Sequence, residues 1–239
     1  MQLVPGLIAA ALTVVAVVPA QVGAQRQSSV DSLLAEFHRP QYFWQQLEVA
    51  KRLVSAGDRR AIELVEPLVT HEDRHLRGNA AYVLAGSGEA RGFDVLAAIL
   101  SDRSERPIGQ GIPGGSMTVG RQITADRYYA VHLLGELGSG RAVDVLVPLL
   151  ADAEVNYKVA WALGKIGDPR AIRPLISALD DSDALVRVGA IQALAELRAA
   201  EALPKLQELL NDNEMPRAGA RVPVAHTARA SIARLQAAR

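Results

Sequence analysis

The sequence repeats itself, and this periodicity constrains the fold more than any other feature of the chain. One pattern has apolar residues at i, i+1, i+4 and i+8, which marks one face of an α-helix. It recurs in Arg59–Val69, Ala90–Leu100, Gly140–Leu150, Pro169–Leu179 and Ala200–Leu210. Each of these segments is followed by a second helical pattern, which has a small residue such as Ala190 and a large one four positions later, such as Leu194. The sequence therefore predicts five consecutive helix pairs.

A helix pair of this kind has a larger apolar face than it can bury alone, so neighbouring pairs must stack on one another. A sixth, degenerate pair precedes the five. Aromatic residues make up only 4% of the chain, so the core must be built from Leu, Val, Ile and Ala, which favours closely packed helices. We expect an all-α fold, a right-handed α-solenoid of about six stacked helix pairs, as a single domain over residues 25–239.

Two insertions interrupt the expected pairs, Arg103–Ile123 and Asn213–Pro223, each between the first and second helix of its pair. Turns of one kind emerge along one edge of a stacked array, so we expect both insertions to border the same surface. At Gly167-Asp168-Pro169, Gly ends one helix, Asp caps the next and Pro occupies its first turn. The expected pairs cover residues 28–56, 57–87, 88–137, 138–166, 167–197 and 198–239.

The first 24 residues have the pattern of a secretory signal peptide. They contain no charged side chain, Leu7–Val18 is an apolar run too short to span a bilayer, and a small-residue site ends at Ala24. We expect cleavage after Ala24, export to the periplasm or the extracellular space, and no stable membrane insertion afterwards. The longer stretch Leu3–Val22 leaves an uncleaved anchor as an alternative, although Pro19 makes it a poor spanning helix.

Charge and cysteine content exclude several classes of function. The 26 basic and 26 acidic side chains balance, which argues against binding of nucleic acid or anionic lipid through bulk charge. The chain has no Cys, so it has no disulfide scaffold, no Cys-ligated zinc and no thiol nucleophile. We therefore expect no nucleic-acid partner.

The most regular repeat carries a family motif. It begins with Gly-Asp-Pro-Arg-Ala-Ile at 167–172, continues with Asp181 after the first helix, and has Val-Arg at 186–187 in the second helix, which runs on to Leu194. These residues resemble the HEAT-repeat family in its short bacterial, phycobilisome-lyase-like form, and the resemblance extends from Ser28 to the C-terminus. It implies an α-solenoid and little about function, because solenoids are mostly binding scaffolds.

The resemblance also implies a ladder in which a turn Asp and a second-helix Arg join neighbouring repeats. The Arg positions are Arg77, Arg127 and Arg187. The ladder is interrupted at Asn156, where the family has Arg, and at His71, which replaces a turn Asp.

Two enzymes with HEAT-like folds offer catalytic alternatives. Deoxyhypusine hydroxylase holds iron with His-Glu pairs at the start of second helices, and this chain has no such pair there. The phycobilisome lyases attach bilins to partner proteins, but no residue here identifies a bilin site, and an exported protein is the wrong place for one. We therefore expect no cofactor, and a lyase-like protein-modifying enzyme stays an alternative.

The segment His71-Glu72-Asp73-Arg74-His75 matches H-E-x-x-H, in which two His on one helix face bind zinc and Glu acts as general base. Here the five residues fall at the turn between paired helices, so His71 and His75 are not expected to share a regular helix. A zinc hydrolase is the second enzymatic alternative, and we expect no metal site.

We expect a protein-binding scaffold or adaptor, not an enzyme. Aromatic side chains on the second helices form a candidate stripe, because Tyr and Trp combine apolar area with a polar tip. Arginines of the insertions form a candidate rim beside it. The candidate partner-binding residues are Tyr82, Tyr128, His132, Tyr157 and Trp161 in the stripe, and Arg106, Arg121, Arg217 and Arg221 in the rim.

Overall fold

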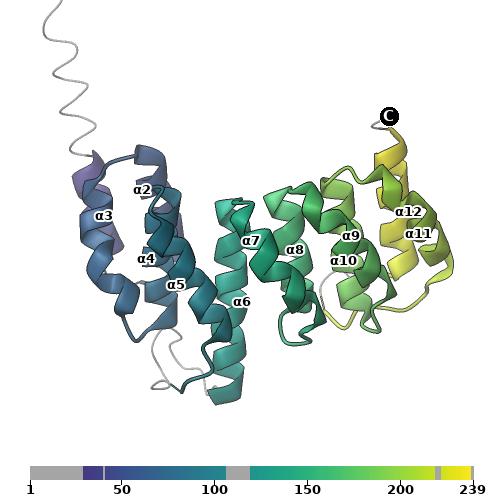
Figure 1. Cartoon of the computed structure of the whole chain (residues 1–239), viewed down its shortest axis with the longest axis horizontal. Helices are drawn as coiled ribbons and strands as arrows, with labels where there is room; N and C mark the ends of the chain where they lie inside the picture. Colours follow the sequence, from purple (N-terminus) through teal and green to yellow (C-terminus); the bar gives the residue numbers. More distant parts are fainter. Residues whose placement is uncertain (1–28, 40, 106–118, 219–221, 238–239) are drawn as a thin grey trace, which may run out of the picture.

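The computed structural model describes residues 29–39, 41–105, 119–218 and 222–237, and within them the helices follow one another in pairs along a row (Figure 1). The first pair joins a helix over residues 29–37 to α2 (Phe43–Ala56), and the second joins α3 (Arg60–Val65) and the 3₁₀ helix η1 (Glu66–Thr70) to α4 (Arg74–Gly86). The third consists of α5 (Ala90–Ser101) and α6 (Val119–Leu137). In the fourth, α7 (Arg141–Leu146) and η2 (Val147–Ala151) precede α8 (Asn156–Ile166).

The last two pairs begin with helices that are 3₁₀ at both ends. One consists of η3 (Pro169–Ala171), α9 (Ile172–Ser177) and η4 (Ala178–Asp180), followed by α10 (Ala184–Glu196). The other consists of η5 (Ala200–Ala202), α11 (Leu203–Glu208) and η6 (Leu209–Asn211), followed by α12 (Val224–Ala237). The described residues thus form six helix pairs without a strand, which confirms the predicted all-α solenoid.

Proline and aspartate explain where these helices change and begin. Pro67 and Pro148 lie in the first turn of η1 and η2, where the missing N–H and the ring break the α-helical bonding. Asp73 caps α4 by accepting hydrogen bonds from the backbone N–H groups of His75 and Leu76 at 2.8 and 3.3 Å. Gly167 ends α8 in the left-handed region at φ +76°, where a side chain would be strained.

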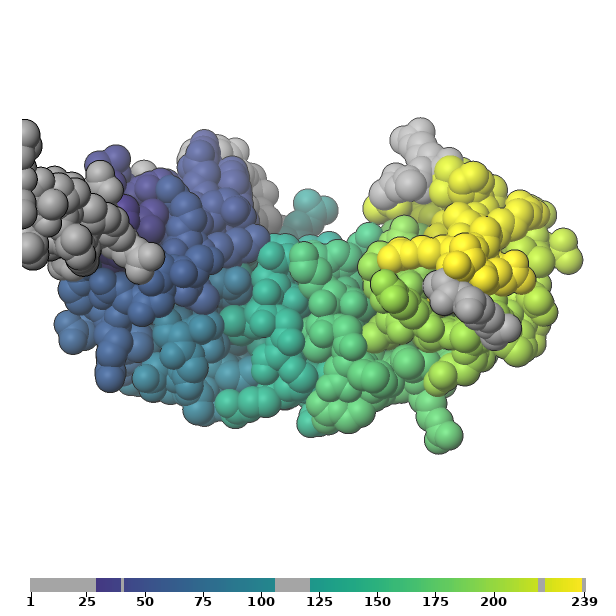
Figure 2. Space-filling view, turned by 90° about the horizontal axis from the view of Figure 1, so that it is seen from above, coloured from purple at the N-terminus to yellow at the C-terminus, as the bar shows by residue number. Residues whose placement is uncertain are grey.

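The row is curved, and its two ends rise on the same side (Figure 2). Second helices of neighbouring pairs pack directly on one another, α6 on α8, α8 on α10 and α10 on α12, whereas neighbouring first helices hardly touch within the described residues. Small residues allow this: a Cβ on Gly164 would lie 2.7 Å from the Cα of Ala193, and one on Gly135 would lie 3.0 Å from the Cβ of Ala162. The more tightly packed second-helix layer therefore forms the inner face of the curve.

An ion-pair ladder joins the repeats at one edge, as the family resemblance implied. Arg77 donates to Asp102 at 2.9 Å and Arg187 donates to Asp212 at 2.9 Å. Arg127 donates in the same way to the carboxylate of Asp152. The Arg127 side chain is 1% exposed and also donates to the Leu100 carbonyl at 2.7 Å. Such charge-assisted bonds fix the register of one repeat on the next.

Of two segments predicted from the sequence, the signal peptide is not described at all and the first insertion is described in part. The signal peptide over residues 1–24 lies outside the described residues, so its cleavage stays a prediction. Helix α6 begins at Val119, so the last five residues of the segment Arg103–Ile123 are helical and do not belong to a loop. Among the described helices, none is both long and apolar enough to cross a membrane.

Candidate binding groove on the inner face

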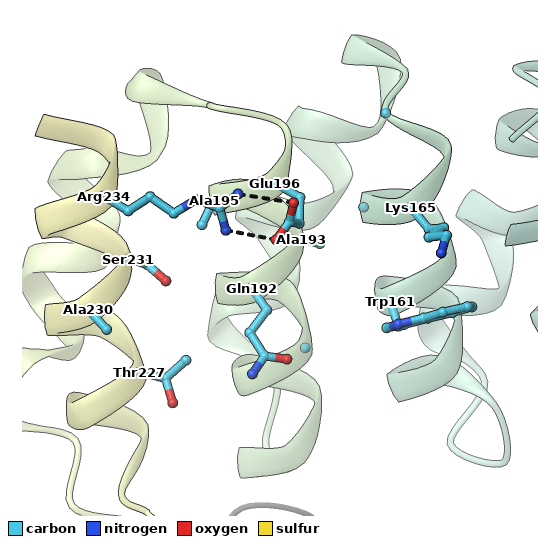
Figure 3. A pocket seen from close by; sticks show the side chains of 13 residues that line it. Trp161, Lys165, Gln192, Ala193, Ala195, Glu196, Thr227, Ala230, Ser231 and Arg234 are labelled. Carbon is cyan, nitrogen blue, oxygen red and sulfur yellow. Dashed lines mark hydrogen bonds and ion pairs between the residues drawn. The ribbon is translucent and has the colours of Figure 1, made fainter. Parts of the chain in front are cut away.

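A groove of about 790 Å³ runs along the inner face between α8, α10 and α12. Figure 3 shows its walls: Trp161 and Lys165 on α8, Gln192 and Glu196 on α10, and Thr227, Ser231 and Arg234 on α12. At one end the groove is bridged, because Arg234 donates two hydrogen bonds to Glu196 at 2.7 and 3.1 Å. The groove combines one large aromatic ring with polar side chains, as ligand-binding clefts commonly do.

Trp161 is held by residues of the neighbouring helix. A Cβ on Gly135 of α6 would lie 2.9 Å from the Trp161 ring, so the absence of a side chain there makes room for the indole. The ring stacks on His132 with a centroid separation of 5.1 Å and an interplanar angle of 27°. The indole is therefore fixed against α6 while it still lines the groove.

Three lysines lie around one carboxylate next to the groove. Lys51 of α2 and Lys165 of α8 both bind Glu136 of α6, at 2.8 and 3.2 Å. The third, Lys158 of α8, has its Nζ 3.5 Å from the Trp161 ring centroid and 5.3 Å from that of Tyr128. Among the described residues, no carboxylate lies within ion-pair distance of Lys158.

This setting changes two protonation equilibria. Burial, reinforced by the nearby charge of Lys165, lowers the pKa of Lys158 to about 8, although Glu136 opposes the shift. Burial, followed by the charge of Lys158, lowers the pKa of His132 to about 4, so this imidazole is neutral at pH 7. The buried Nδ1 of His132 has no hydrogen-bond partner among the described residues.

The aromatic stripe predicted from the sequence is mostly on the inner face, with one exception. Tyr128 is 39% exposed, and Tyr157 and Trp161 are half-buried. Tyr82 is 7% exposed, so its assignment as a partner-binding residue is wrong. Tyr82 lies in α4 and packs in the hydrophobic core, and burial raises the pKa of its hydroxyl.

The predicted arginine rim is described only in part. Arg121 lies in α6 and Arg217 lies in the loop before α12, and both are exposed. Arg106 and Arg221 lie outside the described residues.

The two histidines of the H-E-x-x-H match do not share a helix, as their turn position predicts. His71 has an extended backbone after η1, and its Nδ1 accepts a hydrogen bond from the Asp73 N–H at 3.0 Å. His75 lies in the first turn of α4, 3% exposed, and stacks on Phe43 at 4.1 Å. Within the described residues, no three His, Cys, Asp or Glu side chains gather as metal ligands. This geometry does not favour a zinc hydrolase.

Sequence reasoning missed the lysine cluster. The chain has only four lysines, and Lys158 and Lys165 are seven residues apart, a spacing that places both on one helix face. This spacing could have shown that the aromatic stripe is also a basic one. Glu136 could not have been assigned, because only the tertiary fold brings Lys51 of α2 and Lys165 of α8 to this residue of α6.

Comparison with known proteins agrees with the repeat geometry. A family model described as HEAT repeats matches residues 124–187 and 151–222. The chain contains HEAT repeats over residues 124–222. No curated protein matches the sequence.

Several solved structures are similar to this chain. The complex of CpcE and CpcF of phycocyanin lyase from Nostoc sp. PCC7120 matches with a TM-score of 0.50 at 25% identity, over 74% of this chain and 65% of that one. This HEAT-repeat chain thus spans slightly less than two thirds of that relative. Two engineered proteins match at 20% identity. Their TM-scores are 0.45 and 0.41, over 87% and 86% of this chain and 97% and 56% of theirs.

Proposed function

We propose that this HEAT-repeat protein is an exported, non-catalytic scaffold that binds a protein partner in its inner-face groove. The observation that carries the proposal is the position of Trp161, a large ring anchored on α6 that lines an open groove of about 790 Å³. Interface anchors are commonly aromatic rings in such pockets, surrounded by polar groups that fix orientation. The similarity to a two-protein complex supports a protein partner.

The test compares the two tryptophans of the chain. Trp161 lines the groove, whereas Trp44 is 49% exposed on α2 and stacks on Tyr42 at 4.5 Å. A randomised peptide library displayed on phage is selected on residues 25–239. Trp161→Ala should weaken capture of the selected peptides by roughly 10- to 100-fold, the scale of an interface anchor, and Trp44→Ala should leave it unchanged.

Two outcomes would overturn the proposal: no peptide is selected, or the selected peptides bind Trp161→Ala as well as wild type. Circular dichroism and thermal unfolding of both variants verify that the fold is retained. If Trp161→Ala unfolds, Trp161→Phe keeps an aromatic ring over Gly135 and should retain part of the binding.

The phycocyanin lyase complex favours a second candidate, a protein-modifying role of the lyase kind. A modifying enzyme would leave a covalent mark on its captured partner, whereas a scaffold would not. Intact-mass measurement of a captured protein before and after incubation separates the two. An unchanged mass is the result that the scaffold proposal requires.

A further inference from the structure

The inner face carries more positive charge than its own carboxylates neutralise. Three of the four lysines of the chain, Lys51, Lys158 and Lys165, lie around Glu136. Lys51 binds Glu48 as well as Glu136, and Lys165 binds Glu136. Among the described residues that line the groove, the remaining charges, Glu196 and Arg234, bind each other. Among the described residues of this face, Lys158 therefore remains without a carboxylate.

Lys158 is also held where an unpaired charge is costly. Its ammonium lies on the Trp161 ring and near the Tyr128 ring, and these rings exclude water from one side. A cation whose burial disfavours its charged form gains more from an added carboxylate than a fully solvated lysine does, because the ion pair replaces solvation that is already lost.

The groove begins at the Trp161 ring, next to this ammonium, and presents polar side chains beyond it. Trp161 links the two features, because its ring lies under the Lys158 ammonium and also lines the groove. Beyond it, Gln192 of α10 and Thr227 and Ser231 of α12 project along the groove (Figure 3). Amide and hydroxyl groups at these positions can bond the N–H and C=O groups of a peptide backbone, which need partners once they leave water.

We propose that the groove binds an acidic peptide segment of its protein partner, with an Asp or Glu carboxylate paired to Lys158 beside the Trp161 ring. The inference rests on the proposed function, because it names the chemistry of the partner in that same groove. The balanced overall charge favours a peptide over a nucleic acid, which would require a larger excess of basic side chains.

The experiment repeats the phage selection on Lys158→Met, which removes the charge and keeps an unbranched side chain. Lys205→Met is the matched control, since Lys205 lies on α11 and binds Asp180 and Glu208. Wild type and Lys205→Met should enrich Asp and Glu at one fixed position of the selected peptides. Lys158→Met should lose that preference and still require Trp161.

A selected peptide then provides a double-mutant cycle. Replacing its enriched Glu by Gln should weaken binding to wild type about tenfold, as expected for loss of a charge-assisted bond, and should not weaken binding to Lys158→Met. Free succinate is the probe for a small carboxylate, and single-stranded oligonucleotide is the probe for a nucleic acid. Competition by succinate alone at the affinity of the peptide, or preferential binding of the oligonucleotide, would overturn the proposal.

Failures of the two proposals are distinguishable. Selection of neutral peptides that depend on Trp161 leaves the groove as a binding site and overturns only the acidic partner. An acidic preference that persists in Lys158→Met assigns the charge recognition elsewhere and also overturns it. Absence of any Trp161-dependent peptide overturns the proposed function, and the acidic partner with it.

Discussion

The repeats of this solenoid are joined in two different ways. Between α4 and α6 the junction is polar and aromatic: Arg74 donates to Asp126 at 3.0 Å with both side chains almost fully buried, and Tyr129 donates to Asn79 at 2.6 Å. Between α8 and α10 the contact is made by small residues, with Gly164 directly against Ala193. The same repeat can thus be stacked by filling a wide junction with bonded polar groups or by bringing two backbones together.

The difference follows the sequence. The polar junction joins α4 to α6, the second helix of the pair that carries the insertion, whereas the close junction at Gly164 joins two pairs that have no insertion. A buried polar junction is sensitive to loss of one partner, whereas a close junction is sensitive to added volume. The groove lies at the close junctions, which bring α8, α10 and α12 together on the inner face.

The largest effect is expected at the polar junction. Arg74→Ala removes the buried guanidinium that binds the buried carboxylate of Asp126 and the partly exposed carboxylate of Asp102, and should lower the free energy of unfolding by about 3–5 kcal/mol. Urea denaturation measures this loss. Arg170→Ala, which removes an exposed ion pair with Asp144, should leave the midpoint unchanged, and equal effects of the two variants would contradict the distinction.

A smaller effect is expected from added volume. Gly164→Ala places a Cβ 2.7 Å from the backbone of Ala193, which cannot move without shifting α10, and should cost about 1–3 kcal/mol of unfolding free energy. The matched variant in the polar junction is Gly78→Ala, whose one close contact is the Cδ1 of Leu133 at 2.9 Å, and it should cost less because the end of a side chain can move. If Gly78→Ala is the more destabilising of the two variants, the close junction is not the one that is more sensitive to added volume.

The smallest effect concerns lysine reactivity. With its pKa lowered to about 8, Lys158 loses its charge as pH rises through 8 and becomes nucleophilic there. The pKa of Lys51 is raised, because its hydrogen bonds to Glu136 and Glu48 outweigh burial. Brief acetylation at pH 8, followed by peptide mass spectrometry, should modify Lys158 well before Lys51. Modification of Lys51 first would contradict this assignment of the two environments.

The sequence predicts the repeats because these rest on spacing along single helices, and it predicts the Arg ladder through the family motif that it resembles. It fails for individual rings. Tyr128 and Tyr129 are adjacent, yet one is 39% exposed and the other 7%, because one residue turns a helix by about 100°. Tyr82 has the same register as Trp161, two residues before a repeated Leu, yet it is only 7% exposed, because the neighbouring elements that cover it are not encoded in the spacing of its own helix. The groove was also missed, since it depends on three helices that only the close Gly and Ala contacts bring together.

The most direct test of the binding groove follows each tryptophan separately. In Trp44→Phe the fluorescence comes only from Trp161, and in Trp161→Phe it comes only from Trp44. Titration with a selected peptide should shift the Trp161 emission in a saturable way, at the concentration where binding occurs, and leave the Trp44 emission unchanged. A peptide that binds Trp44→Phe without changing the Trp161 signal, or that changes only the Trp44 signal, would contradict the assignment of the groove as the binding site.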